Sequence, residues 1–304
     1  MKVTLDLDKL LEEDHITQEE YHRLSRFAAR GTSVLAFNLL IGFGVVAVSG
    51  AALALLPSPV TAIVLGLSIC SLGVGLLFLR RAHWKVLANI CILVGALLFG
   101  GGAITAGEGS PGSFLLVAAV YATAGILARS SLLAVLCVLA LASCLGARTG
   151  YYHAAYFLGT KEPAWTVVLF TAFSIGIYHL SKRIPAAYQP MAVVGSRTGV
   201  FLVNLGFWIG SLWGDRILDK NMVIPDWIFA LLWALALLTA GIWAWRRNLR
   251  TLLNIAAVFG AIHFYTQWFE RLGASAEAVL IAGLLALGFA FGLKALNTRL
   301  GRSE

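Results

Sequence analysis

The chain carries the same pattern of residues twice, over 30–129 and again over 197–294, and this repeat limits its possible folds more than any single motif does. In the first copy the shared positions are Arg30, Asn38, Pro59, Arg80, Arg81, Asn89, Ile90, Gly95, Ala96 and Arg129. In the second copy they are Arg197, Asn204, Pro225, Arg246, Arg247, Asn254, Ile255, Gly260, Ala261 and Lys294. The spacing between the copies slips by one residue only twice, as expected for two diverged copies of one unit.

Composition places this repeat in a membrane. The chain is 59% hydrophobic and only 12% charged, whereas soluble domains carry about 25% charged residues. Apolar runs of roughly 17–25 residues are long enough to cross a bilayer as helices, and these runs lack the alternation of barrel strands. We predict ten spans, at 34–56, 60–79, 86–104, 113–128, 131–147, 164–181, 198–213, 227–245, 251–269 and 277–296.

The predicted fold is therefore an all-α polytopic membrane protein with ten transmembrane helices. Spans one to four align with spans seven to ten, and the copies lie six spans apart. Because six is even, both copies have the same orientation, which makes them parallel repeats. The predicted parts are a cytoplasmic helical hairpin (1–33), a four-helix repeat (34–129), a two-helix insert (130–196), a second four-helix repeat (197–296) and a cytoplasmic tail (297–304).

The distribution of basic residues predicts the orientation. The net charge is +8, but only Arg148, Lys161, Arg216, Lys220 and Arg271 of the 23 Lys and Arg residues fall in segments on the outer side. The rest fall in the inner segments, as the positive-inside rule requires when both termini are cytoplasmic. The basic excess therefore reports topology, and we expect the lipid bilayer as partner and no nucleic acid.

Residues 1–33 are expected to form a small helical hairpin in the cytoplasm. Leu5, Leu7, Leu10 and Leu11 give an apolar stripe on a first short helix, and Thr17 with Glu20 has the spacing of a capping box. The second helix is expected to run on into the first span. A hairpin of this size cannot hold a core alone, so we expect it to bind a second copy of the chain or a cytoplasmic protein.

The first half of the chain resembles a known family. The leucine-rich start with Ile16-Thr17, the basic loop, the run Gly100-Gly101-Gly102-Ala103-Ile104 and the aromatic pair Tyr151-Tyr152 look like bacterial predicted membrane proteins of the family Domain of Unknown Function 2157. One departure is Ala106-Gly107-Glu108, where a Gln and a Tyr are expected. The resemblance implies a bacterial inner-membrane protein, and no catalytic residue follows from it.

Four asparagines are the most regular polar group in the spans. Asn38, Asn89, Asn204 and Asn254 each lie about four to six residues inside the predicted cytoplasmic end of a span. One interpretation is hydrogen-bonding between helices, worth about 0.6 kcal/mol each. The other is a polar ring that lines the cytoplasmic end of a cavity between the repeats.

A second polar group follows one face of the ninth span. His263, Gln267 and Glu270 recur at helical spacing, and the matching stretch of the first copy, from Leu98 to Gly102, carries no polar side chain. Either the second copy has acquired a binding site here, or this helix end is simply wetted at the interface beside Tyr265 and Trp268. We expect the His263 ring to face the protein interior beside Gln267.

No motif indicates catalysis. No nucleotide-binding fingerprint, metal-ligand spacing or nucleophile motif occurs, and no catalytic residue, metal site or cofactor is predicted. No acidic residue falls at depth in a predicted span, which disfavours an ion-coupled transporter. Glycine pairs such as Gly42 with Gly44 and Gly73 with Gly75 favour close helix contacts. Three classes stay open: a structural or interaction membrane protein, a passive or weakly coupled carrier of a small or lipophilic molecule, and a membrane enzyme.

Overall fold

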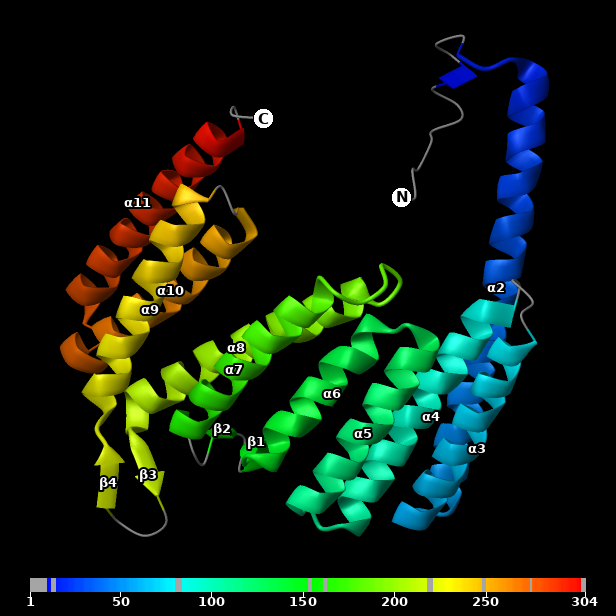
Figure 1. Ribbon diagram of the computed structural model, residues 1–304, viewed down its shortest axis with the longest axis horizontal. Coiled ribbons are helices and arrows are strands. Elements are labelled where there is room, and N and C mark those ends of the chain that lie inside the picture. The colour runs from blue at the N-terminus through cyan, green and yellow to red at the C-terminus, as the bar shows by residue number, and fades with distance from the viewer. Residues whose placement is uncertain are drawn as a thin grey trace. The chain divides into compact units, whose positions relative to one another are not determined.

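The computed structural model describes residues 10–11, 15–79, 84–152, 155–160, 163–217, 221–247, 250–273 and 275–301 (Figure 1). The chain forms two compact units. Unit 1 comprises Met1–Ala140 with Ala186–Met191, and unit 2 comprises Leu141–Pro185 with Ala192–Glu304.

Unit 1 is built from consecutive helices: α2 (Gln18–Leu55), α3 (Pro59–Phe78), α4 (Lys85–Ala106), α5 (Pro111–Ala128) and most of α6 (Ser131–Cys144). Serine caps and a following proline start two of them. The Ser58 side chain accepts from the backbone N–H of Val60, and that of Ser110 accepts from Ser113. A serine cap with proline at the first helical position is a strong start signal.

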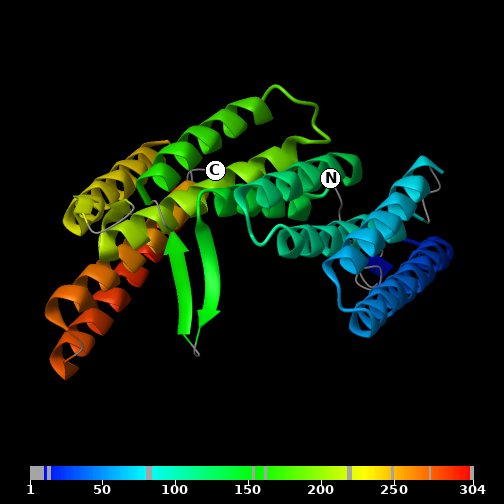
Figure 2. The same cartoon turned by 90° about the horizontal axis from the view of Figure 1, so that it is seen from below.

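Unit 2 contains β1 (Ala147–Tyr152), β2 (Ala155–Thr160), α7 (Pro163–Ser181), α8 (Gln189–Trp213), β3 (Asp215–Ile217), β4 (Asn221–Ile224), α9 (Asp226–Arg246), α10 (Arg250–Leu272) and α11 (Ala276–Gly301). The strands form two antiparallel hairpins, which pair Ala147 with Thr160 and Asp215 with Ile224 at their open ends. The β1–β2 hairpin projects from the helices as a separate ribbon (Figure 2). Both hairpins replace segments that we expected as outer loops.

The helical class predicted from the sequence is confirmed, and within the described residues seven helices are long and apolar enough to cross a membrane. They are Phe37–Leu55 of α2, α3, α4, α5, α7, α8 and α9. The other three predicted spans differ. At 14 residues, α6 is about 21 Å long, short of the roughly 30 Å hydrocarbon core. The apolar part of α11 ends at Gly292, and α10 carries the polar residues of the second copy.

Large apolar side chains cover the outside of these helices. Leu40 and Phe43 on α2, Phe78 on α3 and Leu238 on α9 are each more than 60% exposed. Soluble monomers rarely expose apolar patches of this extent. The surface therefore suits lipid, in agreement with the helix lengths.

Glycines let the backbones of α3 and α4 come close together in unit 1. A Cβ at Gly66 would lie 2.4 Å from the Phe99 nitrogen, and one at Gly95 would lie 2.5 Å from the Cys70 nitrogen. Both distances are to backbone atoms, which cannot move aside as a side chain can. The two backbones touch here because neither position has a side chain.

The amino-terminal segment follows the prediction from Thr17 onward. Thr17 caps α2, its hydroxyl accepting from the Glu20 N–H at 3.3 Å while Glu20 Oε2 accepts from the Thr17 N–H at 3.0 Å, so the predicted capping box is confirmed. From there α2 runs as one helix of 38 residues into the first span and extends past the ends of α3 and α4 (Figure 1). Of the predicted first short helix, residues 1–9 and 12–14 lie outside the described residues.

Replacing Thr17 with alanine tests the cap. We expect Thr17→Ala to destabilise the first turn of α2 by about 1 kcal/mol, because the Glu20 N–H loses its acceptor. Hydrogen exchange should speed up at residues 18–22 and stay unchanged at 40–55. Thr17→Ser, which keeps the hydroxyl, is the control. Equal exchange in wild type and Thr17→Ala would contradict a working cap.

The two segments that share the sequence pattern pack alike in one pair of helices. Gly66 faces Phe99 across α3 and α4, and the same alignment positions in the second copy are Leu232 and Phe264. There the observed pair is Trp233 with His263, one residue away on each helix. The pairs α3–α4 and α9–α10 therefore pack in nearly the same register.

The first helices of the copies differ. Gly42 of α2 faces Ile90 of α4, and the aligned pair is Trp208 with Ile255. Instead, Trp208 bonds Thr266, about three turns further along α10. Asn38 and Asn204 thus align in the sequence as expected. The helices that carry them, α2 and α8, nevertheless contact α4 and α10 at positions about three turns apart in the alignment.

Candidate functional site

A buried hydrogen bond joins α8 to α9 in unit 2. The Trp233 indole Nε1–H donates to Asn204 Oδ1 at 2.9 Å, and Asn204 Nδ2 donates to the Val200 carbonyl at 2.9 Å. Trp233 is 1% exposed and Asn204 is 7% exposed. Burial of two polar groups is tolerable because each finds a partner.

The same tryptophan contacts α10. The His263 ring meets Trp233 edge-on, with ring centroids 4.9 Å apart, a favourable geometry for aromatic pairs. Trp208 Nε1–H on α8 donates to Thr266 Oγ1 at 2.9 Å, one turn from His263. These contacts hold α8, α9 and α10 together around a polar centre.

The other side of α10 is tied to α11. The Tyr265 hydroxyl donates to the Ala282 carbonyl at 2.8 Å, and Trp268 Nε1–H donates to the Ala278 carbonyl at 3.2 Å. Donors of α10 thus meet backbone acceptors of α11, while the face with His263 and Thr266 meets α8 and α9. The rotation of α10 about its axis is thereby fixed, and so is the direction of His263.

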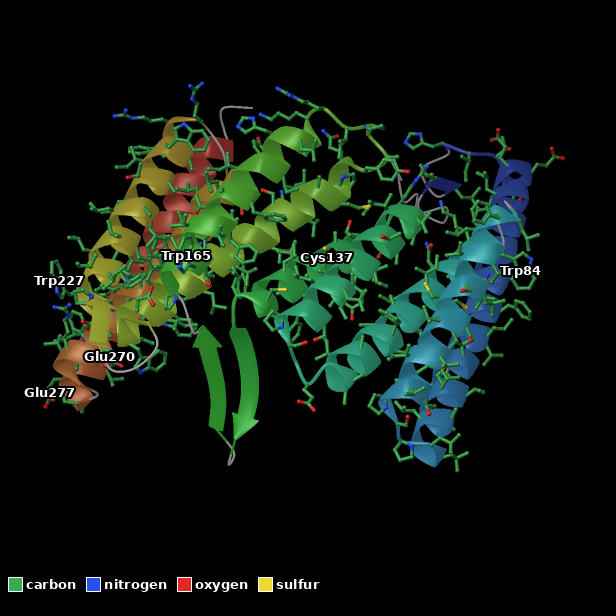
Figure 3. All side chains as sticks on the ribbon, turned by 60° about the horizontal axis from the view of Figure 1, so that its bottom comes forward. Trp84, Cys137, Trp165, Trp227, Glu270 and Glu277 are labelled. Atoms are coloured by element: carbon green, nitrogen blue, oxygen red, sulfur yellow. The ribbon has the colours of Figure 1, made fainter. Side chains whose placement is uncertain are left out.

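Two enclosed atoms on α10 have no hydrogen-bond partner: His263 Nδ1 and Gln267 Nε2. The residues are one helical turn apart, so they share a face. Both side chains are partly buried, whereas Glu270, the third predicted member, is exposed. Figure 3 shows Glu270 at the same end of the unit 2 helices as Trp227 and Glu277. Of the three predicted residues, His263 and Gln267 therefore form a partly buried pair, and Glu270 lies exposed at the helix end.

The four asparagines occupy different surroundings. Asn38 is 1% exposed on α2, and Asn89 is partly buried beside Ile90, which faces Gly42. In unit 2, Asn204 is buried but Asn254 is exposed. Nine residues of α10, about 14 Å, separate Asn254 from His263, which lies at the level of Asn204. Asn204 and Asn254 thus do not line one ring, and Asn204 lies midway along α8 rather than near its start.

Trp233 is the member of this cluster that the sequence did not reveal. Among apolar neighbours it reads as an ordinary core or lipid-facing aromatic residue. The available signal was the comparison of copies: Leu67 and Leu98 of the first copy stand where the second has Trp233 and His263. A tryptophan and a histidine gained at facing positions indicate a contact specific to the second copy.

Asp215 has a structural position in unit 2, where β3 meets the start of α7. It is 2% exposed, and its Oδ2 accepts from the Ala164 N–H at the start of α7, at 3.3 Å. A carboxylate is well placed there, because the first N–H groups of a helix lack internal partners and the helix dipole is positive at that end. Asp215 thus ties the β3–β4 hairpin to α7.

Comparison with protein-family models, with curated proteins and with solved structures finds no match to this chain. Within the described residues, no group of three or more His, Cys, Asp or Glu side chains is placed to hold a metal ion. The chemistry of the polar cluster, formed by Asn204, Trp233, His263 and Gln267, is thus judged from its geometry: it offers hydrogen bonds at a fixed position among aromatic side chains.

Proposed function

We propose that this chain is an interaction protein of the bacterial inner membrane, which uses its amino-terminal helix to bind a second copy or a cytoplasmic protein. The observation that carries the proposal is the length of α2. Its apolar segment is Phe37–Leu55, half of its 38 residues. The other half continues as helix for roughly 28 Å beyond the apolar segment, starting at a complete capping box.

The proposal includes the finer architecture: ten spans, two parallel four-helix repeats with a two-helix insert, and both termini in the cytoplasm. The charge distribution supports the orientation, and the shared register of α3–α4 and α9–α10 supports the repeat. Membership of the family Domain of Unknown Function 2157 belongs to the same proposal, on the strength of the residues given above.

Cysteine cross-linking of the full chain in its native membrane tests the interaction. With Cys70, Cys91, Cys137 and Cys144 changed to alanine, Glu19→Cys and Leu24→Cys should each give a cross-linked species with a bifunctional maleimide. A band at twice the chain mass indicates a second copy, and another mass indicates a partner protein. Ser110→Cys, at the opposite end of the spans, is the matched control. No cross-linked species from either helix position would contradict the proposal.

A second candidate function is favoured by the polar cluster. A carrier needs a binding position at depth in the membrane, and in proteins of repeated architecture such sites lie near the bilayer midplane. The cluster lies midway along α8 and α10 and differs from the matching positions of the first copy. Uptake of a lipophilic solute by vesicles that contain the protein, reduced in a His263→Leu variant, is the result expected of a carrier.

A further inference from the structure

We propose that the face of α10 formed by His263 and Gln267 binds a neutral, lipid-soluble carbonyl compound. The inference concerns unit 2 and goes beyond the interaction role, since none of its residues lies on α2. The inference rests on the second candidate function and names the chemistry of its ligand. Its test measures binding rather than transport. A ligand that binds but is not transported would therefore reject the carrier function and keep the binding site.

The first step is the hydrogen-bonding capacity left in the cluster. Trp233 Nε1–H is engaged with Asn204, and Asn204 Nδ2 with Val200. His263 Nδ1 and Gln267 Nε2 are enclosed and without a partner. An enclosed polar atom without a partner destabilises the fold, so a ligand that pairs with these atoms recovers that loss. Gln267 Nε2 is a donor and the imidazole nitrogen can donate in one tautomer, so the matching ligand atom is an acceptor oxygen.

The lack of charged residues on α9 and α10 near the cluster indicates a neutral ligand. On α10, the residues between Arg250 and Glu270 are uncharged, and on α9 the same holds between Asp226 and Arg246. A carboxylate or phosphate brought between these helices would lie in a region of low dielectric without a described cation beside it, at high cost. The acceptor is therefore the oxygen of a neutral carbonyl group.

The surroundings of His263 and its position along α10 indicate a ligand with an apolar body. Phe201 of α8 and Phe259 of α10 form an aromatic contact about one turn from His263. His263 lies nine residues from the end of α10, about 14 Å along the helix. Both features suit a molecule with an apolar body that dissolves in the hydrocarbon. Two sources supply such a carbonyl: a free lipophilic molecule such as a quinone, and the ester group of a bilayer lipid.

The cluster is also held rigidly. Trp233 fixes the His263 ring edge-on, and Tyr265 and Trp268 fix α10 against α11. Groups held by such contacts bind without losing further conformational entropy. Trp233 and Asn204 are thus positioning residues, and His263 and Gln267 would touch the ligand.

The test is equilibrium binding of radiolabelled decylbenzoquinone to the full chain in nanodiscs, with decylbenzene, which lacks the carbonyl oxygens, as the matched probe. We expect saturable binding of the quinone only, and about a tenfold loss of affinity in both His263→Leu and Gln267→Leu. His263→Gln, which keeps a donor, should retain more affinity than His263→Leu. Trp243→Phe, an exposed change on α9, should bind as wild type does, and thermal melting of each variant shows that it is folded.

Two lipid compositions separate the sources. If lipid esters occupy the site, the quinone should bind more tightly in nanodiscs of ether-linked lipids, whereas equal affinity in both assigns the site to a free molecule. Either result keeps the carbonyl site. Equal binding of decylbenzene, no saturable binding at all, or unchanged affinity in folded His263→Leu and Gln267→Leu variants would overturn it.

Discussion

Gly66→Ala and Gly95→Ala are expected to destabilise the protein by about 1–3 kcal/mol each, because a new methyl group has no space between α3 and α4. At Gly66 the added carbon would meet the Phe99 backbone at 2.4 Å, and at Gly95 it would meet the Cys70 backbone at 2.5 Å. Only separation of the two helices relieves these contacts. A lower midpoint of thermal unfolding in detergent, measured by the loss of monodisperse protein, checks the prediction.

Gly75→Ala is the matched control on the same helix. A Cβ there meets nothing within 4 Å, and alanine is the better helix former by roughly 0.5–1 kcal/mol. Gly75→Ala should therefore leave the midpoint unchanged or raise it. If all three variants melt together, the close contact of α3 and α4 is not formed in the membrane protein.

Trp233→Ala is expected to destabilise unit 2 by about 3–5 kcal/mol, the cost of removing a large buried aromatic side chain. Trp233→Phe keeps most of the side-chain volume but leaves Asn204 Oδ1 buried without its donor. This change should lower the free energy of unfolding by about 1–3 kcal/mol. The exposed Trp243 on the same helix gives the control, and Trp243→Phe should change stability by less than about 0.5 kcal/mol.

A double-mutant cycle isolates the hydrogen bond from the packing. Once Asn204 is replaced by leucine, Trp233→Phe should cost less than it does in the wild type, because no acceptor is left unpaired. A coupling free energy of about 1 kcal/mol between the two positions is expected. Strict additivity of the single variants would show that Trp233 and Asn204 do not interact.

Helix pairs illustrate what the sequence could and could not predict. Gly42 with Gly44, and Gly73 with Gly75, both suit a close helix contact. In the structure a Cβ at Gly42 or Gly73 meets a neighbouring helix, and one at Gly44 or Gly75 meets nothing. Composition marks a helix as able to approach another closely, but which face does so depends on the partner helix, which the local sequence does not contain.

The candidate site shows the same division. His263 and Gln267 were predictable because helical spacing is a local property and because the copies differ there. Trp233 was not, since its role depends on the packing of α9 against α8 and α10. Asp215 bonds an N–H 51 residues away, a contact that no pattern within its loop indicates.

We propose ten membrane spans with both termini in the cytoplasm, and insertion of a topology reporter tests this topology most directly. Reporters placed in the full chain at Glu108, Ala155, Lys220 and Gly273 should respond from the outer side of the membrane. Reporters at His83, Pro190 and Asn248 should respond from the cytoplasm. This alternation requires α6, α10 and α11 to cross the bilayer along with the seven longer apolar helices. A cytoplasmic response at Ala155 or Lys220 would contradict the account.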